Sequence, residues 1–361
     1  MIRLETLAAD VTELQGHDWP PVAPFEKLAA QLDMFLGLDM HQQKDQLAAL
    51  RGNADAYGAF LHGSLGTLYA YVLGYRDSPL FLATDDAVEA RLHGAKIVLE
   101  REMLEHFLAP PPPPALPGRA AKLDYLEHLA MNNPGVHDPF FDFVADRATR
   151  PALREFLRCE VTRNEVVDDE VALLSVGLQG TLKKVTASNL WDECGNGNLV
   201  NFHTYWLRRL LERTTDWNGI LRWRAEEGPW FSRISSNSFN MLLTRPGYTY
   251  RAYGSFLITE AWVEPHFERI LAGLARCALD HPDIAVYFSR HVRIDPHHTA
   301  EMIAALRAQR PELSERALDE VILGAHVAIA AGTLMYRRLH EHLASDRVAA
   351  HGESAPHDPR T

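Results

Sequence analysis

The stretch from Val321 to Met335, VILGAHVAIAAGTLM, decides the fold class. Apolar side chains occupy nearly every face of the helix that it would form, which is typical of a helix surrounded by other helices. The same character extends over the wider segment 312–343. No part of the chain alternates apolar and polar residues for long enough to predict a strand. We therefore expect an all-α protein with this segment as a central helix.

Working outward, apolar residues recur at helical spacing in further segments, namely 86–108, 237–244, 250–278 and one that opens at Arg150-Pro151. The five prolines Pro110–Pro114 interrupt this pattern, because proline cannot continue a helix and favours an extended connector. We expect three parts: a helical extension over residues 1–118 that ends in this connector, a helical domain over 119–345, and a polar tail over 346–361 that stays disordered.

The bulk composition limits the partners of the chain. Its 361 residues carry 36 Lys and Arg against 48 Asp and Glu, for a net charge of −12, and no basic run predicts nucleic-acid binding. Neither a signal peptide nor a stretch of roughly 18 apolar residues is evident, so we expect a cytoplasmic protein without membrane contact. Cys159, Cys194 and Cys277 lie too far apart for a disulfide framework or a zinc-type pair.

Three candidate metal ligands, His291, Asp295 and His298, lie at offsets of four and seven. These offsets place two imidazoles and a carboxylate on one side of a helix. Pro296 supports a different interpretation, in which Asp295 caps a helix that begins at the proline and both histidines lie on the surface. His297 is offset by six from His291 and points elsewhere, so His298 is the preferred partner.

Glu193 and His203 form a second candidate pair, around the sequence NLWDECGNGN that ends five residues before His203. On an unbroken helix their separation would leave the two side chains about 80° out of line. Gly195 and Gly197 weaken the helix and allow a kink that aims both side chains at one point. The alternative is a plain helix end at Gly195 with a new helix from Asn198.

Other carboxylates are candidate ligands as well. Glu260 stands in the largely apolar stretch 257–262, and a buried acid needs a partner, so it is either a ligand or a core glutamate that a neighbour satisfies. A fourth candidate is an acidic helix face, which is either a source of ligands or a solvated surface. Its residues are Glu160, Glu165, Asp168, Asp169 and Glu170.

Residues from about 150 to 345 resemble the heme-oxygenase-like diiron oxidases and oxygenases, also described as iron-containing redox enzymes. The resemblance lies in the segment Asn189–His203, which is similar to the family's Asn…Asp-Glu-x-Gly…His segment, and in His291-x3-Asp295-x2-His298. It implies a heme-oxygenase-like helical bundle that binds iron without haem and that carries, in this chain, an N-terminal helical extension.

The resemblance implies seven ligands for two Fe(II) ions. One ion would be held by Glu193, His203 and His298. The other would be held by Glu165, His291 and Asp295. Glu260, 31 residues before His291, would bridge them, and the expected catalytic residues are Glu193, His203, Glu260 and His298. Glu165, 28 residues before Glu193, fits the ligand expected on the first core helix best, with Glu160 and Glu170 as alternatives. Carboxylate and imidazole ligands without thiolate independently suit Fe(II) or Mn(II), and ligand type alone leaves zinc as an alternative.

Other architectures fit less well. Ferritin-like bundles supply Glu-x-x-His motifs, and the sequence contains none. A haem enzyme would need a proximal histidine such as His128 or His137, and a thiaminase-like enzyme would need a nucleophilic cysteine such as Cys194. Serine-hydrolase, phosphate-loop and dinucleotide-binding fingerprints are absent.

By this resemblance the chain uses O₂ and an external reductant to oxidise a small molecule in specialised metabolism. An amino acid is the favoured substrate, through desaturation, cyclisation or N-oxygenation, and a fatty acid is the alternative. The carboxylate of an amino acid would want an arginine, for which the candidates are Arg245, Arg251, Arg290 and Arg293. A hypothesis of another class is a metal-free helical binding protein. The N-terminal extension would either cover the bundle or pair two chains in a homodimer.

Overall fold

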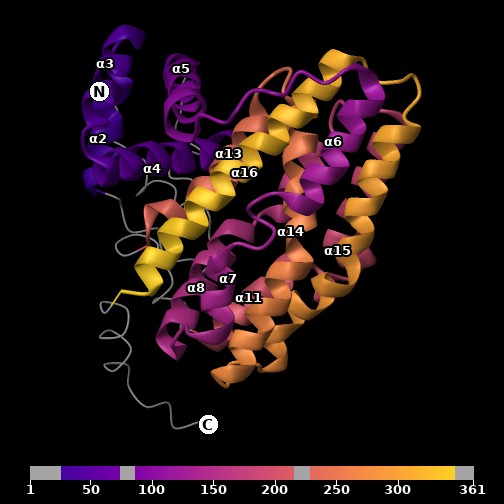
Figure 1. Cartoon of the computed structure of the whole chain (residues 1–361). Coiled ribbons are helices and arrows are strands. Elements are labelled where there is room, and N and C mark those ends of the chain that lie inside the picture. Colours follow the sequence, from indigo (N-terminus) through magenta and orange to yellow (C-terminus); the bar gives the residue numbers. More distant parts are fainter. Residues whose placement is uncertain (1–25, 74–85, 215–227, 346–361) are drawn as a thin grey trace. The chain divides into compact units, whose positions relative to one another are not determined.

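Every element of the computed structural model is a helix within the residues that it describes, 26–73, 86–214 and 228–345 (Figure 1). The side chains of residues 26, 27, 29 and 294–296 fall outside this description. The prediction of an all-α fold is confirmed. The chain forms two compact units, Met1–Pro110 with Asp216–Met241, and Pro111–Thr215 with Leu242–Thr361. The first boundary between them falls within the predicted proline connector.

In its described residues the first unit contains four whole α-helices and two short helical segments, together with the first part of α13 (Ile234–Thr244). They are α2 (Glu26–Leu36), α3 (Met40–Leu50), α4 (Ala54–Val72), α5 (Asp86–Glu102), the π-helical η1 (Met103–Leu108) and the 3-10 turn η5 (Trp230–Arg233). Asp39 begins α3 with a capping box, because its side chain accepts from the backbone of Gln42 while the Gln42 side chain accepts from the Asp39 backbone. The return of residues 228–241 to this unit extends it beyond the predicted boundary at residue 118.

A buried carboxylate, Glu102, ties α3, α4 and α5 together. It accepts hydrogen bonds from Arg51 Nε at 2.7 Å and from the Tyr57 hydroxyl at 2.6 Å. Burial alone would raise the pKa of Glu102, but these two donors outweigh it and hold the pKa below its usual value. The side chain is therefore ionised and paired at neutral pH.

The second unit contains the remaining helices. In chain order they are α6 (Gly118–Asn132), α7 (Pro139–Asp146), α8 (Arg150–Asn164), α9 (Val167–Leu174), α10 (Gly180–Glu193), η2 (Gly195–Gly197), η3 (Leu199–Asn201), α11 (His203–Thr214), α14 (Thr249–Arg276), α15 (Pro282–Ala308) and α16 (Glu315–Leu343). The boundary between the two units falls within α13 (Ile234–Thr244). The predicted helical segments 86–108, 237–244, 250–278 and 312–343 correspond to α5 with η1, α13, α14 and α16.

Helix α14 packs against both α15 and α16. It approaches α16 most closely at two glycines: a Cβ on Gly254 would lie 1.9 Å from the Val321 carbonyl oxygen, and a Cβ on Gly324 would lie 1.8 Å from the Arg251 carbonyl oxygen. No side chain fits in either position, because the backbones themselves are in contact. These glycines fix the position of α14, which carries Glu260.

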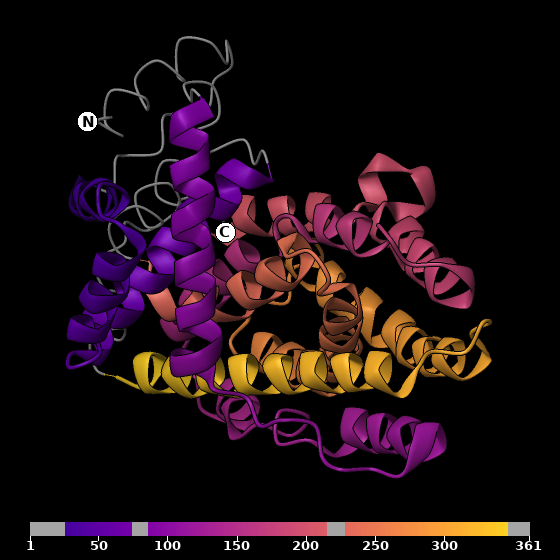
Figure 2. The same ribbon diagram turned by 90° about the horizontal axis from the view of Figure 1, so that it is seen from above.

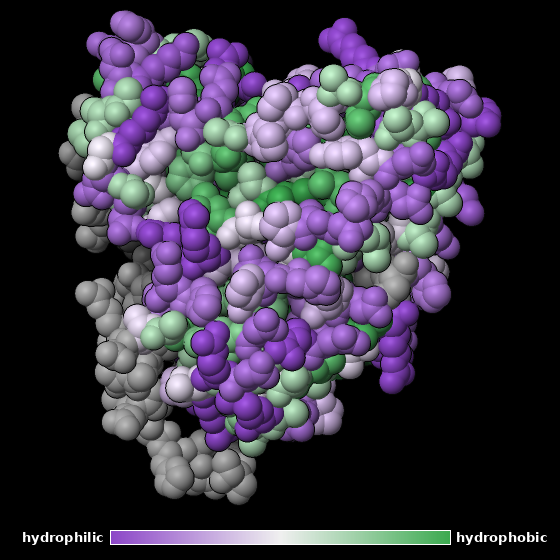
Figure 3. Space-filling model, viewed as in Figure 1, coloured by the Kyte–Doolittle hydropathy of each residue, from purple (hydrophilic) through white to green (hydrophobic). Residues whose placement is uncertain are grey.

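Helix α16 is the long straight yellow helix of Figure 2. Among the described residues it alone is long and apolar enough to pass a membrane-span criterion, but 61% of its most apolar window is buried inside the protein. Its packing against α14 and α6 accounts for that composition, as expected of a central helix. Hydrophilic residues cover most of the face of the molecule seen in Figure 3.

The backbone of α15 runs without interruption through Pro296. The start signals lie instead at its true beginning, where the His281 side chain accepts from the Asp283 backbone and Pro282 occupies the first turn. The alternative of a helix start at Asp295 with two surface histidines is therefore wrong, since His291 and His298 are both buried. The predicted disordered tail, residues 346–361, lies outside the described residues.

Candidate metal centre

Glu193 and His203 meet at the end of α10 and the start of α11. The helix ends at Glu193, a tight turn follows at Gly195–Gly197, and a new helix begins at His203, which agrees with the interpretation of Gly195 as a helix end. The turn nevertheless brings Glu193 Oε2 within 2.7 Å of His203 Nδ1. Both side chains are buried, and the contact lacks the angles of a hydrogen bond.

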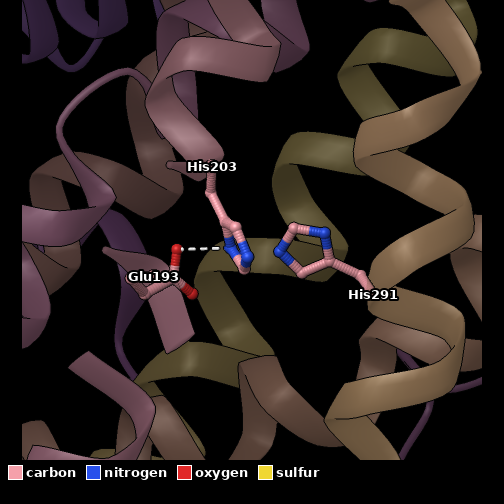
Figure 4. Close-up of side chains that lie close together, drawn as sticks. All are labelled: Glu193, His203 and His291. Carbon is pink, nitrogen blue, oxygen red and sulfur yellow. Dashed lines mark ion pairs between the residues drawn. The ribbon is translucent and has the colours of Figure 1, made fainter. Parts of the chain in front are cut away.

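His291 reaches the same point from α15. Its Nδ1–H donates to the Tyr287 carbonyl oxygen at 2.6 Å, which leaves the Nε2 lone pair as the donor atom for a metal. Ligand atoms of Glu193, His203 and His291 all lie within 4.8 Å of one another. Figure 4 shows the two rings pointing toward each other, with the carboxylate beside His203. Trp206 stacks on His203 at 4.9 Å and closes this side of the cluster.

His298 and Glu260 lie in direct contact as well. His298 Nδ1 is 3.0 Å from Glu260 Oε2, and its Nε2 is 3.1 Å from Asp192 Oδ2. Two ligand atoms that are each about 2.1 Å from one ion lie roughly 3 Å apart when the ion is octahedral. The separations between Glu260 and His298, and between Glu193 and His203, therefore have the size expected of neighbouring ligands.

The charges in this cluster favour binding of a cation. Burial would raise the pKa of Glu193, but His203 and the other nearby histidines outweigh it and hold the pKa below its usual value. Burial lowers the pKa of His291 to about 3, and the neighbouring His203 adds to the effect, so the ring stays neutral at pH 7. Burial raises the pKa of the Glu260 carboxyl. Neutral imidazoles and carboxylates are the forms that bind metal ions.

The donor atoms of this cluster are suited to bind iron. Glu193 Oε2 and His203 Nδ1 are buried polar atoms that face each other at 2.7 Å, as two ligands of one ion would. The donor atoms are oxygen and imidazole nitrogen, which suit Fe(II). The nearby thiol of Cys194 has a raised pKa, because burial and the carboxylates of Asp168 and Glu193 disfavour the thiolate. A thiaminase-like nucleophile at Cys194 is thereby disfavoured.

The remaining predicted ligands are placed less closely. Glu165 is half-buried at the C-terminal end of α8, where the helix ends and a short turn leads to α9. Of its alternatives, Glu160 contacts Arg163 Nη2 at 2.5 Å and Glu170 is buried on α9. The side chain of Asp295 lies outside the described residues. Glu165 and Asp295 as iron ligands stay predictions.

The haem-ligand and arginine candidates from the sequence are exposed or contact other residues. Both histidines suggested for haem, His128 and His137, are exposed, so neither offers a buried proximal ligand. Four arginines were considered for a substrate carboxylate. Arg251 pairs with Glu320, Arg245 lies over the Tyr248 ring at 5.6 Å, and Arg290 and Arg293 are exposed.

Two acids near the cluster were not among the predicted ligands, although Asp168 belongs to the acidic helix face noted in the sequence. Asp192 contacts His298, and Asp168 accepts a hydrogen bond from the hydroxyl of Thr204, the neighbour of His203, at 3.4 Å. Spacing along one helix cannot find these contacts, because Asp192 on α10 meets His298 on α15 and Asp168 on α9 meets Thr204 on α11 through the tertiary fold. The adjacency of Asp192 to a ligand was the available signal.

An unsatisfied amide lies one turn before Glu193 on the same face of α10. Asn189 is fully buried, and neither atom of its amide has a hydrogen-bond partner among the described residues. Thr299, which follows His298, is also buried, and its hydroxyl has no hydrogen-bond partner among the residues that the structure describes. Leaving such groups unsatisfied costs roughly 1–3 kcal/mol each.

Helices α10 and α15 pack against each other, and each carries one of these two groups. Thr181 donates to the Ala305 carbonyl oxygen at 2.8 Å at one end of the contact, and Asp192 meets His298 at the other end. Interpolating along the two antiparallel helices sets Asn189 opposite the turn that contains Thr299.

The model of the iron-containing redox enzyme family matches residues 154–333, which include all seven predicted ligands. Two crystal structures of a CADD-like protein of unknown function from Nostoc punctiforme are similar to the chain. One has a TM-score of 0.50 at 15% identity and covers 62% of this chain and 97% of its own. The other has a TM-score of 0.47 at 13% identity and covers 66% and 97%. The first shows a shared fold. No curated protein matches the chain.

Proposed function

The chain belongs, through residues 154–333, to the iron-containing redox enzyme family, and from this premise we propose that it is a non-haem diiron oxidoreductase that uses O₂ to oxidise a small molecule. One observation carries the proposal. Glu193, His203 and His291 converge inside the matched segment with buried ligand atoms within 4.8 Å of one another.

We propose that the seven side chains implied by the sequence hold two Fe(II) ions. Five of them support this by their positions, namely Glu193, His203, Glu260, His291 and His298. In two-metal sites the ions lie about 3.5–4 Å apart, and Glu260 would bridge them. His291, which the resemblance assigns to the second ion, has a ligand atom within 4.8 Å of those of Glu193 and His203. Glu165 and Asp295 complete the proposed set.

Bound iron would supply the electrons that activate O₂ for oxidation of the substrate. The chain itself supplies a dry, preorganised site. His291 is held at a fixed angle by the Tyr287 carbonyl, and the aromatic ring of Phe267 lies 5.5 Å from it. Such walls exclude water and protect reactive species from side reactions. An external reductant would return the iron to Fe(II).

The proposed substrate is a small molecule with a polar group that both donates and accepts hydrogen bonds, as an amino acid does. Support comes from Asn189, whose amide offers a donor and an acceptor, and from the Thr299 hydroxyl. The four arginines considered from the sequence give no such support. A fatty acid would leave the Asn189 amide facing an apolar chain, which is unfavourable.

Anaerobic titration of metal-free protein with Fe(II), followed by a pulse of O₂ monitored by visible absorption, tests the proposal. We expect about two ions per chain, as in two-metal sites, and a transient absorption band after O₂. The His203→Ala variant should lose at least one ion, whereas His128→Ala, which removes an exposed histidine on α6, should bind as the parent does. Absence of binding in folded parent protein would instead favour the metal-free interaction protein.

A further inference from the structure

Asp192 is held from both sides by the residues around the metal centre. Its Oδ2 lies 3.1 Å from His298 Nε2, and its Oδ1 accepts a hydrogen bond from the Asn196 amide at 3.2 Å. Asp192 is not among the seven proposed ligands. Its carboxylate is partly exposed, whereas the Glu260 carboxylate on the other side of the His298 ring is buried.

The two nitrogens of His298 therefore face different environments. Nδ1 points at Glu260, the proposed bridging ligand, at 3.0 Å. Nε2 points at Asp192, toward the outside of the cluster. An imidazole that binds a metal through one nitrogen carries its proton on the other, and a carboxylate that accepts this proton fixes both the ring angle and the tautomer.

We propose that Asp192 is a positioning residue of the metal centre. It accepts the Nε2–H of His298 and so presents the Nδ1 lone pair to the metal beside Glu260. This inference rests on the proposed function, because it assigns a role to Asp192 only if a metal binds here. Asp192 touches neither metal nor substrate and acts through His298.

The turn after α10 holds Asp192 in place. Gly195, Asn196 and Gly197 all have positive φ, at 55°, 56° and 79°. A Cβ on Gly195 would lie 2.4 Å from the carbonyl carbon of Asn201, so only glycine fits there. Asparagine tolerates the left-handed conformation better than most residues. The turn thereby aims the Asn196 amide back at Asp192, four residues earlier.

His291 provides an internal comparison within the same helix. Its Nδ1–H is held by the backbone carbonyl of Tyr287, so it presents Nε2, the opposite nitrogen from His298. That contact lies within α15 and does not involve Asp192 or the turn. A change at Asp192 should therefore alter the tautomer of His298 and leave that of His291 unchanged. General loosening of the fold would affect both rings.

The experiment uses the full chain labelled with ¹⁵N-histidine and loaded with Zn(II), a diamagnetic probe. Long-range ¹H–¹⁵N NMR identifies the protonated nitrogen of each ring, and competition with a chelator gives the Zn(II) affinity. In the parent we expect His298 protonated at Nε2 and His291 at Nδ1. Asp192→Asn should bind Zn(II) about 10–100-fold more weakly, as loss of an outer-shell partner does, with the His298 signals changed and those of His291 retained.

Asn196→Ala tests the second contact without touching His298. We expect a smaller loss of affinity, and we expect Asp192→Asn with Asn196→Ala to be no weaker than Asp192→Asn alone, because Asn196 acts through Asp192. Asp169→Asn, at an exposed acid on α9, is the matched control and should bind as the parent does.

Three results would overturn the inference. The first is His298 protonated at Nδ1 in the Zn(II)-loaded parent. The second is an unchanged Zn(II) affinity in Asp192→Asn. The third is complete loss of one ion in Asp192→Asn with the His298 tautomer unchanged, which would make Asp192 a ligand. Failure of the folded parent to bind either Zn(II) or Fe(II) would overturn the proposed function as well. Metal binding by the parent without an effect of Asp192 would overturn the inference alone.

Discussion

Replacing Gly254 with alanine should destabilise the second unit, because the new methyl group would overlap the backbone of α16. The Cβ would lie 1.9 Å from the Val321 carbonyl oxygen, whereas a carbon and an oxygen in contact are about 3.3 Å apart. Moving α14 away from α16 is the only relief, since a carbonyl inside a helix cannot rotate out. Overpacking of this kind costs about 3 kcal/mol at the upper end of its usual range. The better helix propensity of alanine returns about 1 kcal/mol.

We therefore expect the Gly254→Ala variant to lose about 2 kcal/mol in the free energy of unfolding, or about 4–8 °C in Tm for a unit of this size. Calorimetry of the metal-free protein measures this directly. Gly94→Ala, on α5, is the matched control: nothing lies within 4 Å of its Cβ, so the same substitution should be neutral or stabilise. Harmless substitutions change the free energy of unfolding by up to about 0.5 kcal/mol. A change in Gly254→Ala no larger than that would refute the close contact of α14 and α16.

Three further substitutions probe other features. Asn189→Leu should stabilise the metal-free protein by about 1–2 kcal/mol in denaturant unfolding, because it removes an unsatisfied amide; a loss of stability would mean that the amide has a partner. Glu102 has a folded pKa below its unfolded value of 4.5, so its pairing stabilises the fold above that pH and is lost as the pH falls. Glu102→Gln should accordingly lower stability by about 1–3 kcal/mol at pH 7 and flatten the decline of Tm below pH 4.5, and an unchanged decline would contradict the pairing. Cys194→Ser should keep full iron binding and oxidation, because the raised pKa of this thiol opposes a nucleophilic role; loss of oxidation with iron retained would restore that role.

The helices were predictable because their signals are local. The apolar faces of α16 and the periodicity of α14 depend on neighbouring residues in the chain, and both helices appear within a few residues of the expected bounds. The return of residues 228–241 to the first unit was not predictable, since it depends on contacts between segments far apart in sequence.

The candidate site was predictable only in part, for a similar reason. Spacing identified His291 and His298, and both are buried on one continuous helix. Pro296 misled the local analysis, because start signals at His281 and Pro282 had already determined where α15 begins. The contact of Asp192 with His298 joins residues 106 apart, and no pattern along one helix can show it.

The clustered side chains come from four separate helices, and this affects the stability and abundance of the protein. Glu193 ends α10, His203 begins α11, Glu260 lies on α14, and His291 belongs to α15. Two ions held by side chains of these four helices would fasten the bundle together and would bind the folded chain alone, each adding about 2.7 kcal/mol of stability at a hundredfold excess over its Kd. We expect Tm to rise with Fe(II), and no rise would contradict this linkage. In a cell short of iron, a larger fraction of the molecules would be unfolded and accessible to proteases. The abundance of the protein would therefore follow the iron supply.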